Sequence, residues 1–237
     1  MRREFQPLVL CYHAVSDDWQ HVLAVRPRAI RDQLHALLRR GYAPATAEEI
    51  TAGEGRRLHV TFDDAYRSVA TVLPELERLG VFCTIFACAD YAHDGRPLAV
   101  PELAAEADAH PAELATMTVD QLRDLAERGI EIGSHTSTHA HLTQLSETEL
   151  ELELSGSRAR LEDELGQRCR FLAYPYGEHD ARVRAAARSA GYEAAFALRS
   201  QGPLIDPFAV PRVGIYRGDS RLRSRLKTSA LIRRVLA

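Results

Sequence analysis

The sequence predicts an α/β fold in which strands and helices alternate along the chain. Short apolar runs rich in Val, Ile, Phe and Tyr are separated by stretches whose apolar residues recur at helical spacing. Several runs are apolar without alternation, which is typical of parallel strands buried on both faces. Glycine follows most of the helical stretches, as is common at helix C-termini. This order indicates a repeating βα fold, either open or closed into a barrel.

Seven strands and five main helices are expected. The strands span residues 8–15, 58–64, 81–88, 130–135, 170–175, 193–198 and 209–216. The helices span residues 28–40, 69–79, 119–128, 146–165 and 181–190. The first helix has Ile30, Leu34 and Leu37 on one stripe. The fourth starts with Ser146 three residues before Glu149, which is a capping-box pattern.

Two segments fall outside this repeat. Residues 89–117 contain three prolines and no clear period, and a long connection of this kind is usually functional or mobile. We expect a surface excursion that resembles a lid. Residues 217–237 hold seven Lys and Arg against one acidic residue. We expect an apolar face there from Leu222, Leu226, Leu231, Ile232, Val235 and Leu236. Such a basic amphipathic tail either lies on an anionic membrane surface or packs on the barrel with its arginines in solvent.

The totals restrict partners and location. The formal net charge is −3, so charge gives no reason to expect nucleic-acid binding. The four cysteines form no CxxC pair and three lie in apolar runs, which indicates reduced, buried thiols. Neither a signal peptide nor a run of roughly 20 apolar residues is visible. We therefore expect a cytoplasmic protein, with peripheral membrane contact through the tail as an additional hypothesis.

Polar side chains follow four of the expected strands. His13 ends the first strand, the pair Asp63 and Asp64 ends the second, and His135 ends the fourth, with His139 four residues later. The Pro-Tyr-Gly turn at 175–177 follows the fifth. In βα barrels and open α/β sheets, catalytic groups gather at the carboxyl ends of strands.

These side chains favour a metal site. Histidines at i and i+4 lie on one helical face and can reach one ion, with one of the two aspartates as a third ligand. Two imidazoles and a carboxylate suit zinc, although cobalt, nickel or iron would also bind. The other aspartate would then be free to act as a base. The structural alternatives are a helix-face coincidence for the histidines, a turn with a helix N-cap for the aspartates, and a solvated helical position for His141.

The motifs resemble those of the polysaccharide deacetylases, the NodB homology domain. The first motif of that family is similar to Thr61-Phe62-Asp63-Asp64-Ala65, the second to residues 134–139 (Ser-His-Thr-Ser-Thr-His), and the third to residues 174–177 (Tyr-Pro-Tyr-Gly). The resemblance extends over roughly residues 8–216.

The resemblance implies a distorted (β/α) barrel of about seven parallel strands that removes acetyl groups from N-acetylated sugars. It implies a catalytic domain over 1–216, with 89–117 as a lid-like excursion and 217–237 as the tail. Asp64, His135 and His139 would hold the metal, for which zinc is our first expectation. Asp63 would be the catalytic base, and the backbone N–H of Tyr176 would help to form the oxyanion hole.

The chain departs from the family pattern in three places. Ala65 replaces a glycine, and we expect helical backbone there. Ala173 replaces the usual arginine, and Arg212 is our candidate for the missing guanidinium. No histidine follows His179, so the usual late general acid is absent. His13 is the candidate substitute, with a hydrogen-bonding role as the equal alternative.

The function expected from these residues is hydrolysis of the N-acetyl amide of a sugar or glycan. Cytoplasmic substrates of this kind include a nucleotide sugar, a small glycoside and a lipid-linked glycan. Two alternatives remain open. One is a deformylase or deacylase that acts on another amino-sugar amide, lipid-linked or free; the other is a non-catalytic, glycan-binding relative.

Overall fold

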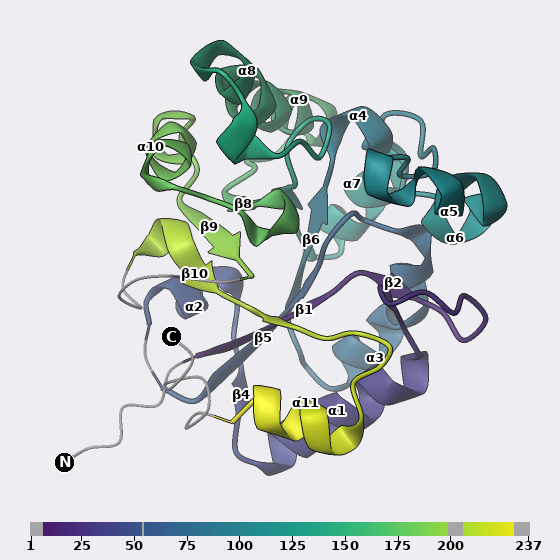
Figure 1. Ribbon diagram of the computed structural model, residues 1–237. Helices are drawn as coiled ribbons and strands as arrows, with labels where there is room; N and C mark the ends of the chain where they lie inside the picture. Colours follow the sequence, from purple (N-terminus) through teal and green to yellow (C-terminus); the bar gives the residue numbers. More distant parts are fainter. Residues whose placement is uncertain (1–6, 54, 199–205, 230–237) are drawn as a thin grey trace.

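The computed structural model describes residues 7–53, 55–198 and 206–229. Six strands lie side by side and all pair in parallel. In chain order they are β1 (Leu8–Tyr12), β5 (Arg57–Phe62), β6 (Cys83–Ala87), β7 (Glu131–Ser134), β8 (Phe171–Ala173) and β9 (Ala194–Ala197). Figure 1 shows these strands in the middle of the molecule with the helices around them.

The last strand is split, and its two halves join the two edges of the sheet. The first half, β10 (Val210–Pro211), pairs with β9, whereas the second half, β11 (Val213–Gly214), pairs with β1. Arg212 lies at the break, where its backbone N–H donates to the carbonyl of Ala197. The parallel sheet is thereby nearly closed. This confirms the distorted (β/α) barrel, and it confirms about seven strands when β10 and β11 are taken as one.

Short strands complete the sheet pairing. β4 (Ala43–Pro44) pairs with β5, while β2 (Ala14–Val15) and β3 (Ala24–Val25) form a separate pair. The main helices lie where the sequence predicts them. They are α1 (Pro27–Arg39), α3 (Leu73–Arg78), α7 (Val119–Glu127), α8 (Glu147–Glu151), α9 (Ser157–Leu165) and α10 (Ala181–Ser189). Two of them are extended by other helix types: the 3₁₀ turn η1 (Arg67–Thr71) precedes α3, and the π-helical segment η4 (Leu152–Gly156) joins α8 to α9.

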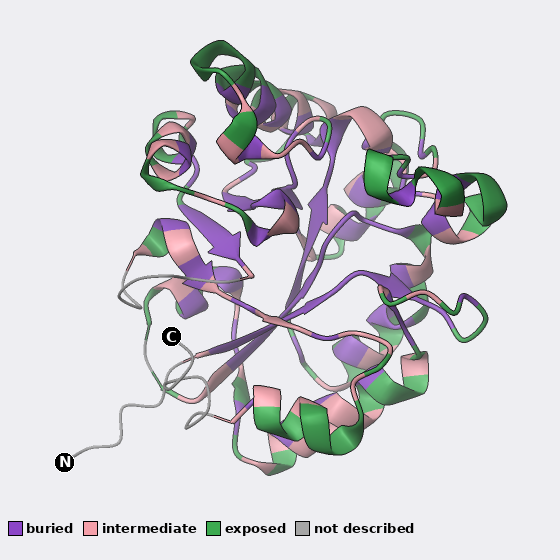
Figure 2. Ribbon diagram, in the orientation of Figure 1, coloured by how far each residue is buried: buried purple, intermediate pink, exposed green. Residues whose placement is uncertain are grey.

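Alternate residues of the strands enter two different cores. Leu8, Leu10 and Tyr12 of β1 belong to the large core shared with the helices. Val9 belongs to a smaller cluster with Phe196, which also includes the short helix α2 (Ala47–Thr51). Side chains of a strand alternate between its faces, so the smaller cluster fills the interior of the ring. Figure 2 shows the strands almost wholly buried, as expected for a parallel sheet covered on both sides.

The 89–117 excursion is built from short helices rather than irregular chain. They are α4 (Ala89–Ala92), η2 (Pro101–Leu103), α5 (Ala104–Ala109) and α6 (Pro111–Leu114). Helices of three to six residues are too short to produce a readable period, which explains why no helix or strand is predicted here from the sequence. The Trp19 indole N–H donates to Glu106 at 2.8 Å, and the Ser16 hydroxyl donates to Glu113 at 3.0 Å. These bonds fasten the excursion to the chain around β2 and β3.

The tail begins with α11 (Arg221–Lys227), an exposed helix. The buried residue Thr228 follows it and bonds to Arg40 of the turn after α1. Four of the predicted apolar positions, at 231, 232, 235 and 236, lie outside the described residues. Within the described ranges, no helix is both long and apolar enough to span a membrane.

Candidate active site

The carboxyl ends of the parallel strands bring the predicted site residues together. Asp63 and Asp64 follow β5, His135 follows β7, and His13 follows β1. Arg212 joins them from the split last strand. All five side chains are buried. The turn Pro175–Gly177, which follows β8, contributes Tyr176 at the rim of the site.

Asp64 lies between two imidazole nitrogens. Its Oδ1 is 3.6 Å from His135 Nε2 and 3.4 Å from His139 Nε2. His135 Nδ1 lies 2.8 Å from the carbonyl oxygen of Ala173. Because a carbonyl only accepts, Nδ1 carries the proton, and the lone pair of Nε2 faces the carboxylate. Three ligand atoms, one from each residue, therefore converge on one point and lie within 4.8 Å of one another.

The protonation states of this triad suit a bound cation. Burial lowers the pKa of both His135 and His139 to about 4, so both rings are neutral near pH 7. Burial also raises the pKa of Asp64. Its Oδ1 has no hydrogen-bond partner among the described residues, which is costly for a buried carboxylate. Neutral imidazoles and a carboxylate oxygen that no hydrogen-bond donor occupies are what metal binding requires.

The spacing of the triad also fits a metal. Ligands about 2.0–2.2 Å from a tetrahedral ion stand roughly 3.3–3.6 Å from one another. The two distances from Asp64 Oδ1 fall at these values. Asp64, His135 and His139 therefore fit a divalent metal, and their donor set is one that zinc, cobalt, nickel or iron accepts.

The histidine stretch is a loop, so the helical interpretation of its i and i+4 spacing is wrong. No helix covers residues 135–141. Thr136 and His139 have left-handed φ values of 70° and 66°, and these turns bring the second imidazole back to the first. The carboxylate of Glu153, in η4, accepts the backbone N–H of Ser137 at 2.9 Å and the hydroxyl of Thr138 at 2.6 Å. Glu153 thus braces the loop.

The backbone after the first aspartate also differs from expectation. Ala65 is not helical: it has φ 48°, and Asp64 before it has φ 67°. Two consecutive left-handed residues cost roughly 1–2 kcal/mol each without glycine. The turn separates the two neighbouring carboxylates, so that they have different contacts.

Asp63 is held by a buried guanidinium. Arg212 Nη1 donates to Oδ1 at 2.6 Å, and Nη2 donates to Oδ2 at 2.9 Å, which is a bidentate pair. Cys11 Sγ donates to Oδ2 at 3.3 Å. Burial alone would raise the pKa of Asp63, but Arg212 and the nearby histidines hold it well below its usual value. Burial raises the pKa of the Cys11 thiol, which remains protonated and able to donate.

His13 lies close to Asp63. Its ring is stacked beside Tyr216 with centroids 6.3 Å apart, and its Nδ1 has no hydrogen-bond partner in the described part of the chain. Ligating atoms of Cys11, His13 and Asp63 also lie within 4.8 Å of one another. Because the guanidinium of Arg212 already occupies the Asp63 carboxylate, this second cluster is a poor cation site.

Tyr176 adopts a left-handed conformation with φ 60° and ψ 0°. Its ring stands edge-on to His139, with centroids 4.7 Å apart, and stacks flat on His141 at 3.9 Å. Its hydroxyl donates to Glu102 of η2 at 2.9 Å. His141 lies outside the metal triad, with Nδ1 3.0 Å from Glu178 and Nε2 3.3 Å from Glu102.

Three further residues of this region were not foreseen from the sequence. Cys11 was assigned only a buried position, and nothing distinguished Glu102 or Glu153 from other acidic residues of their segments. In the structure, Cys11 bonds to Asp63, Glu102 bonds to Tyr176, and Glu153 bonds to the histidine loop.

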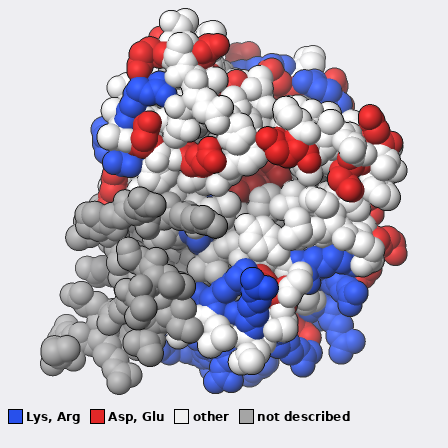
Figure 3. Space-filling model, viewed as in Figure 1, with Lys and Arg blue, Asp and Glu red and all other residues white. Residues whose placement is uncertain are grey.

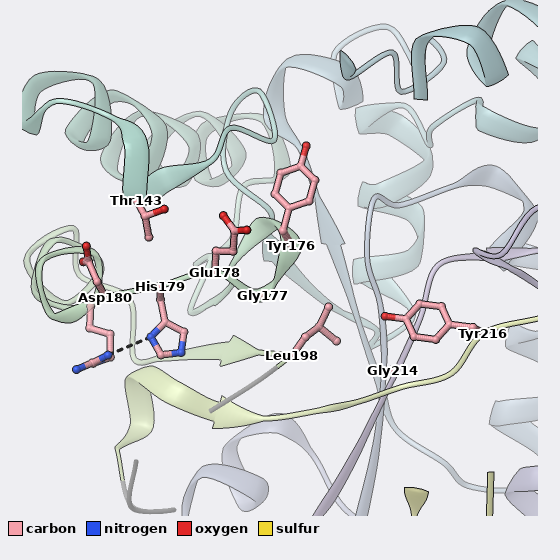
Figure 4. A pocket seen from close by; sticks show the side chains of 10 residues that line it. Thr143, Tyr176, Gly177, Glu178, His179, Asp180, Leu198, Gly214 and Tyr216 are labelled. Carbon is pink, nitrogen blue, oxygen red and sulfur yellow. Dashed lines mark hydrogen bonds between the residues drawn. The ribbon is translucent and has the colours of Figure 1, made fainter. Parts of the chain in front are cut away.

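A hollow of about 780 Å³ opens beside Tyr176. It reaches from Tyr176 and Tyr216 to Asp180 and Arg184, and Figure 4 shows its lining side chains. Tyr216 points its hydroxyl toward the hollow, whereas the Tyr176 ring points away from it. The volume lies within the roughly 300–1,000 Å³ common for small-molecule sites.

Comparisons with known proteins show which family the chain belongs to. The polysaccharide deacetylase family model matches residues 51–195, more than half of the chain. The chain belongs to the polysaccharide deacetylase family. A relative is YxkH of Bacillus subtilis (strain 168), whose name places it among the polysaccharide deacetylases; it is 25% identical over 226 residues, which are 90% of this chain and 72% of the relative.

Solved structures show the same fold. The polysaccharide deacetylase BC0361 from Bacillus cereus has a TM-score of 0.76 and 22% identity, over 95% of this chain and 70% of its own. IcaB from Ammonifex degensii has a TM-score of 0.75 and 22% identity, over 95% and 98%. The deacetylase PplD from Streptococcus pyogenes, solved in complex with acetate, has a TM-score of 0.72 and 19% identity, over 95% and 99%.

Proposed function

We propose that the protein is a metal-dependent amide hydrolase that removes the N-acetyl group from an N-acetylated sugar or glycan and releases acetate. One observation carries this proposal. Of two adjacent buried aspartates, Asp63 is paired with Arg212, whereas Asp64 faces two neutral imidazoles and lacks a hydrogen-bond donor on Oδ1 within the described residues. A base and a metal-binding carboxylate thus stand side by side. Membership of a deacetylase family supports the same chemistry.

Asp64, His135 and His139 are the residues that would hold the metal, and we propose zinc. A divalent cation supplies Lewis-acid polarisation of the amide carbonyl and lowers the pKa of a water toward roughly 7. The hydrogen bond from His135 Nδ1 to Ala173 keeps Nε2 unprotonated for this task.

Asp63 is the proposed general base. It takes a proton from the attacking water as the water oxygen bonds to the amide carbon. Arg212 contacts both carboxylate oxygens, so it keeps Asp63 ionised and fixes the direction of its remaining lone pairs. Arg212 thereby supplies the guanidinium that Ala173 cannot provide.

Tyr176 and His13 complete the proposed set. The backbone N–H of Tyr176 donates to the oxygen on which negative charge develops, where such donors contribute most. The C–N bond then breaks, and His13 gives a proton to the departing amine. The position of His13 beside Asp63 and the unpartnered Nδ1 within the described chain support this role over a purely hydrogen-bonding one.

Acetate release is the direct test of the proposal. Purified protein is incubated with N-acetylglucosamine oligosaccharides and with their N-formyl analogues, and acetate and formate are quantified separately. We expect acetate from the first substrate. Formate alone would replace the proposal with the deformylase alternative. Tight glycan binding without either product, from protein with full metal content, would support the glycan-binding alternative.

A cytoplasmic location is also proposed. All four cysteines are buried and free, which suits a reducing compartment.

In Figure 3, Lys and Arg gather on the lower part of the face, over α11. α11 exposes Leu222 and Leu226, so we propose peripheral contact with anionic lipid. Co-sedimentation with anionic liposomes that is lost on deleting 221–237 supports this contact, and no binding at low salt removes it.

A further inference from the structure

The 89–117 excursion forms a fixed wall along one side of the candidate active site. Besides the bonds of Glu106 and Glu113 to the β2–β3 region, Arg67 donates to the backbone carbonyls of Thr116 and Gly95 at 2.8 Å and 3.2 Å. Leu98, Leu103 and other apolar residues of the excursion share a small core with Trp19 and Tyr66. A segment held at so many points can position residues as a strand or helix does.

Glu102 connects this wall to Tyr176 in the candidate active site. Its Oε2 accepts the Tyr176 hydroxyl at 2.9 Å, and its Oε1 lies 3.3 Å from His141 Nε2. His141 in turn stacks flat on the Tyr176 ring and bonds Glu178 on its other nitrogen. The ring is therefore held at its hydroxyl and on one face, while its edge contact with His139 fixes the other side.

Tyr176 needs such support because its backbone is in a region that L-residues avoid. A left-handed conformation at a non-glycine residue costs of the order of 1–3 kcal/mol and persists only when the surroundings determine it. The next residue, Gly177, also has positive φ, and a Cβ there would stand 2.5 Å from Leu198 Cβ. Gly177 is thus packed closely against Leu198, and the side chain of Tyr176 is a second point at which the turn is held.

We propose that Glu102 is a positioning residue: by holding the Tyr176 side chain, it keeps the left-handed backbone that aims the Tyr176 N–H at the reacting carbonyl. This inference rests on the proposed function for the N–H itself. The excursion then acts as a fixed support of the catalytic turn. Removal of one oxyanion donor typically costs 10²–10³ in kcat, so a donor that is only misaligned loses roughly tenfold.

The test compares Glu102→Ala with Glu102→Gln and with a matched control. Glu106→Ala also removes a carboxylate of the excursion that accepts from an aromatic side chain, but its partner is Trp19 and not Tyr176. For Glu102→Ala we expect kcat to fall roughly tenfold with KM unchanged. Glu102→Gln retains an acceptor oxygen and should recover most of that loss, while Glu106→Ala keeps wild-type kcat. Equal losses in Glu102→Ala and Glu106→Ala would overturn the proposal.

A second readout does not depend on turnover. Backbone amides of Gly177 and Glu178 donate to the carbonyls of Tyr174 and Pro175. Their hydrogen exchange should accelerate at least about tenfold in Glu102→Ala and in Tyr176→Phe, and the double variant should exchange no faster than Glu102→Ala, because both changes remove the bond between Glu102 and the Tyr176 hydroxyl. Additive increases, or none, would overturn the inference. A wild-type protein that releases no acetate would refute the proposed function but leave this exchange result in place.

Discussion

The two neighbouring aspartates of the candidate site have opposite surroundings. Asp63 receives two hydrogen bonds from Arg212 and one from Cys11. Asp64, one residue later and equally buried, faces the imidazoles of His135 and His139 on its Oδ1, which no donor of the described residues occupies. The protein itself therefore stabilises the charge of the first aspartate and leaves the second to a cation.

The electrostatics follow from these contacts. The guanidinium and nearby histidines hold the pKa of Asp63 well below its usual value despite burial, whereas burial raises the pKa of Asp64. A carboxylate that stays ionised suits a base, and one that lacks a positive partner suits a metal ligand. Adjacent residues diverge in this way because the backbone turns at Asp64 and Ala65, both of which have positive φ.

The largest expected effect is on turnover when the base is removed. In Asp63→Asn, acetate release should fall by about 10³-fold, because general-base catalysis contributes roughly 10²–10⁴. The amide is isosteric, so zinc content should stay at the wild-type level. Loss of zinc together with activity would mean that Asp63 is itself a ligand, and the division between the two aspartates would be wrong.

The second prediction concerns stability of the metal-free protein. With chelator present, Asp63→Asn should lower the free energy of unfolding by about 3–5 kcal/mol, because it leaves the buried charge of Arg212 unpaired. Asp64→Asn removes a carboxylate for which the described part of the chain offers no Lys or Arg partner, so the free energy of unfolding should change little or rise. Urea unfolding of the two variants measures both. Similar losses in the two would contradict the asymmetry.

Arg212→Lys should reduce kcat by roughly 10- to 100-fold, since lysine cannot form the two parallel bonds of the guanidinium. Acid unfolding provides a companion measurement. The lowered pKa of Asp63 means that the pair contributes fully to stability above pH of about 4, and that this contribution is lost as the pH falls toward the lowered pKa.

Arg212→Met should therefore unfold at higher pH than wild type. Unchanged kcat in Arg212→Ala, alongside an inactive Asp63→Ala, would remove Arg212 from the assignment.

Much of this arrangement was predictable from the sequence. Strand ends are readable because apolar runs stop at polar residues, and this predicts His13, Asp63, Asp64 and His135 at the strand ends where the structure has them. Arg212 came from the resemblance instead, as a substitute for the arginine that Ala173 replaces. The glycine-terminated helices and the seven strands were readable for the same local reason. Because all strands of a parallel sheet run in the same direction, their carboxyl ends lie at one edge, and the polar residues that follow them meet there.

The remaining features depend on geometry that local patterns do not carry. The spacing of His135 and His139 is the same in a helix and in a loop with two left-handed turns, and the structure uses the loop. Glu153 and Glu102 act through contacts made across distant segments. Cys11 looks like any buried apolar position until β1 is paired beside β5, which places its thiol at Asp63.

The smallest expected effect belongs to that thiol. Cys11→Ala removes one neutral donor from Asp63 while the bidentate Arg212 remains, so kcat should fall only about threefold to tenfold, in line with about 1 kcal/mol for a hydrogen bond. Cys11→Ser retains a donor and should lie nearer to wild type. Cys83→Ala, at a buried cysteine of β6, is the matched control. A loss in Cys83→Ala as large as in Cys11→Ala would show a packing effect instead.

The most direct test of the central claim combines metal content with turnover. Wild type, Asp63→Asn and Asp64→Asn are stripped with chelator, returned to zinc, and assayed for bound zinc and for acetate released from N-acetylglucosamine oligosaccharides. Wild type should lose activity on stripping and regain it with zinc, Asp63→Asn should bind zinc without releasing acetate, and Asp64→Asn should do neither. Acetate release by wild type that survives complete metal removal would contradict the account.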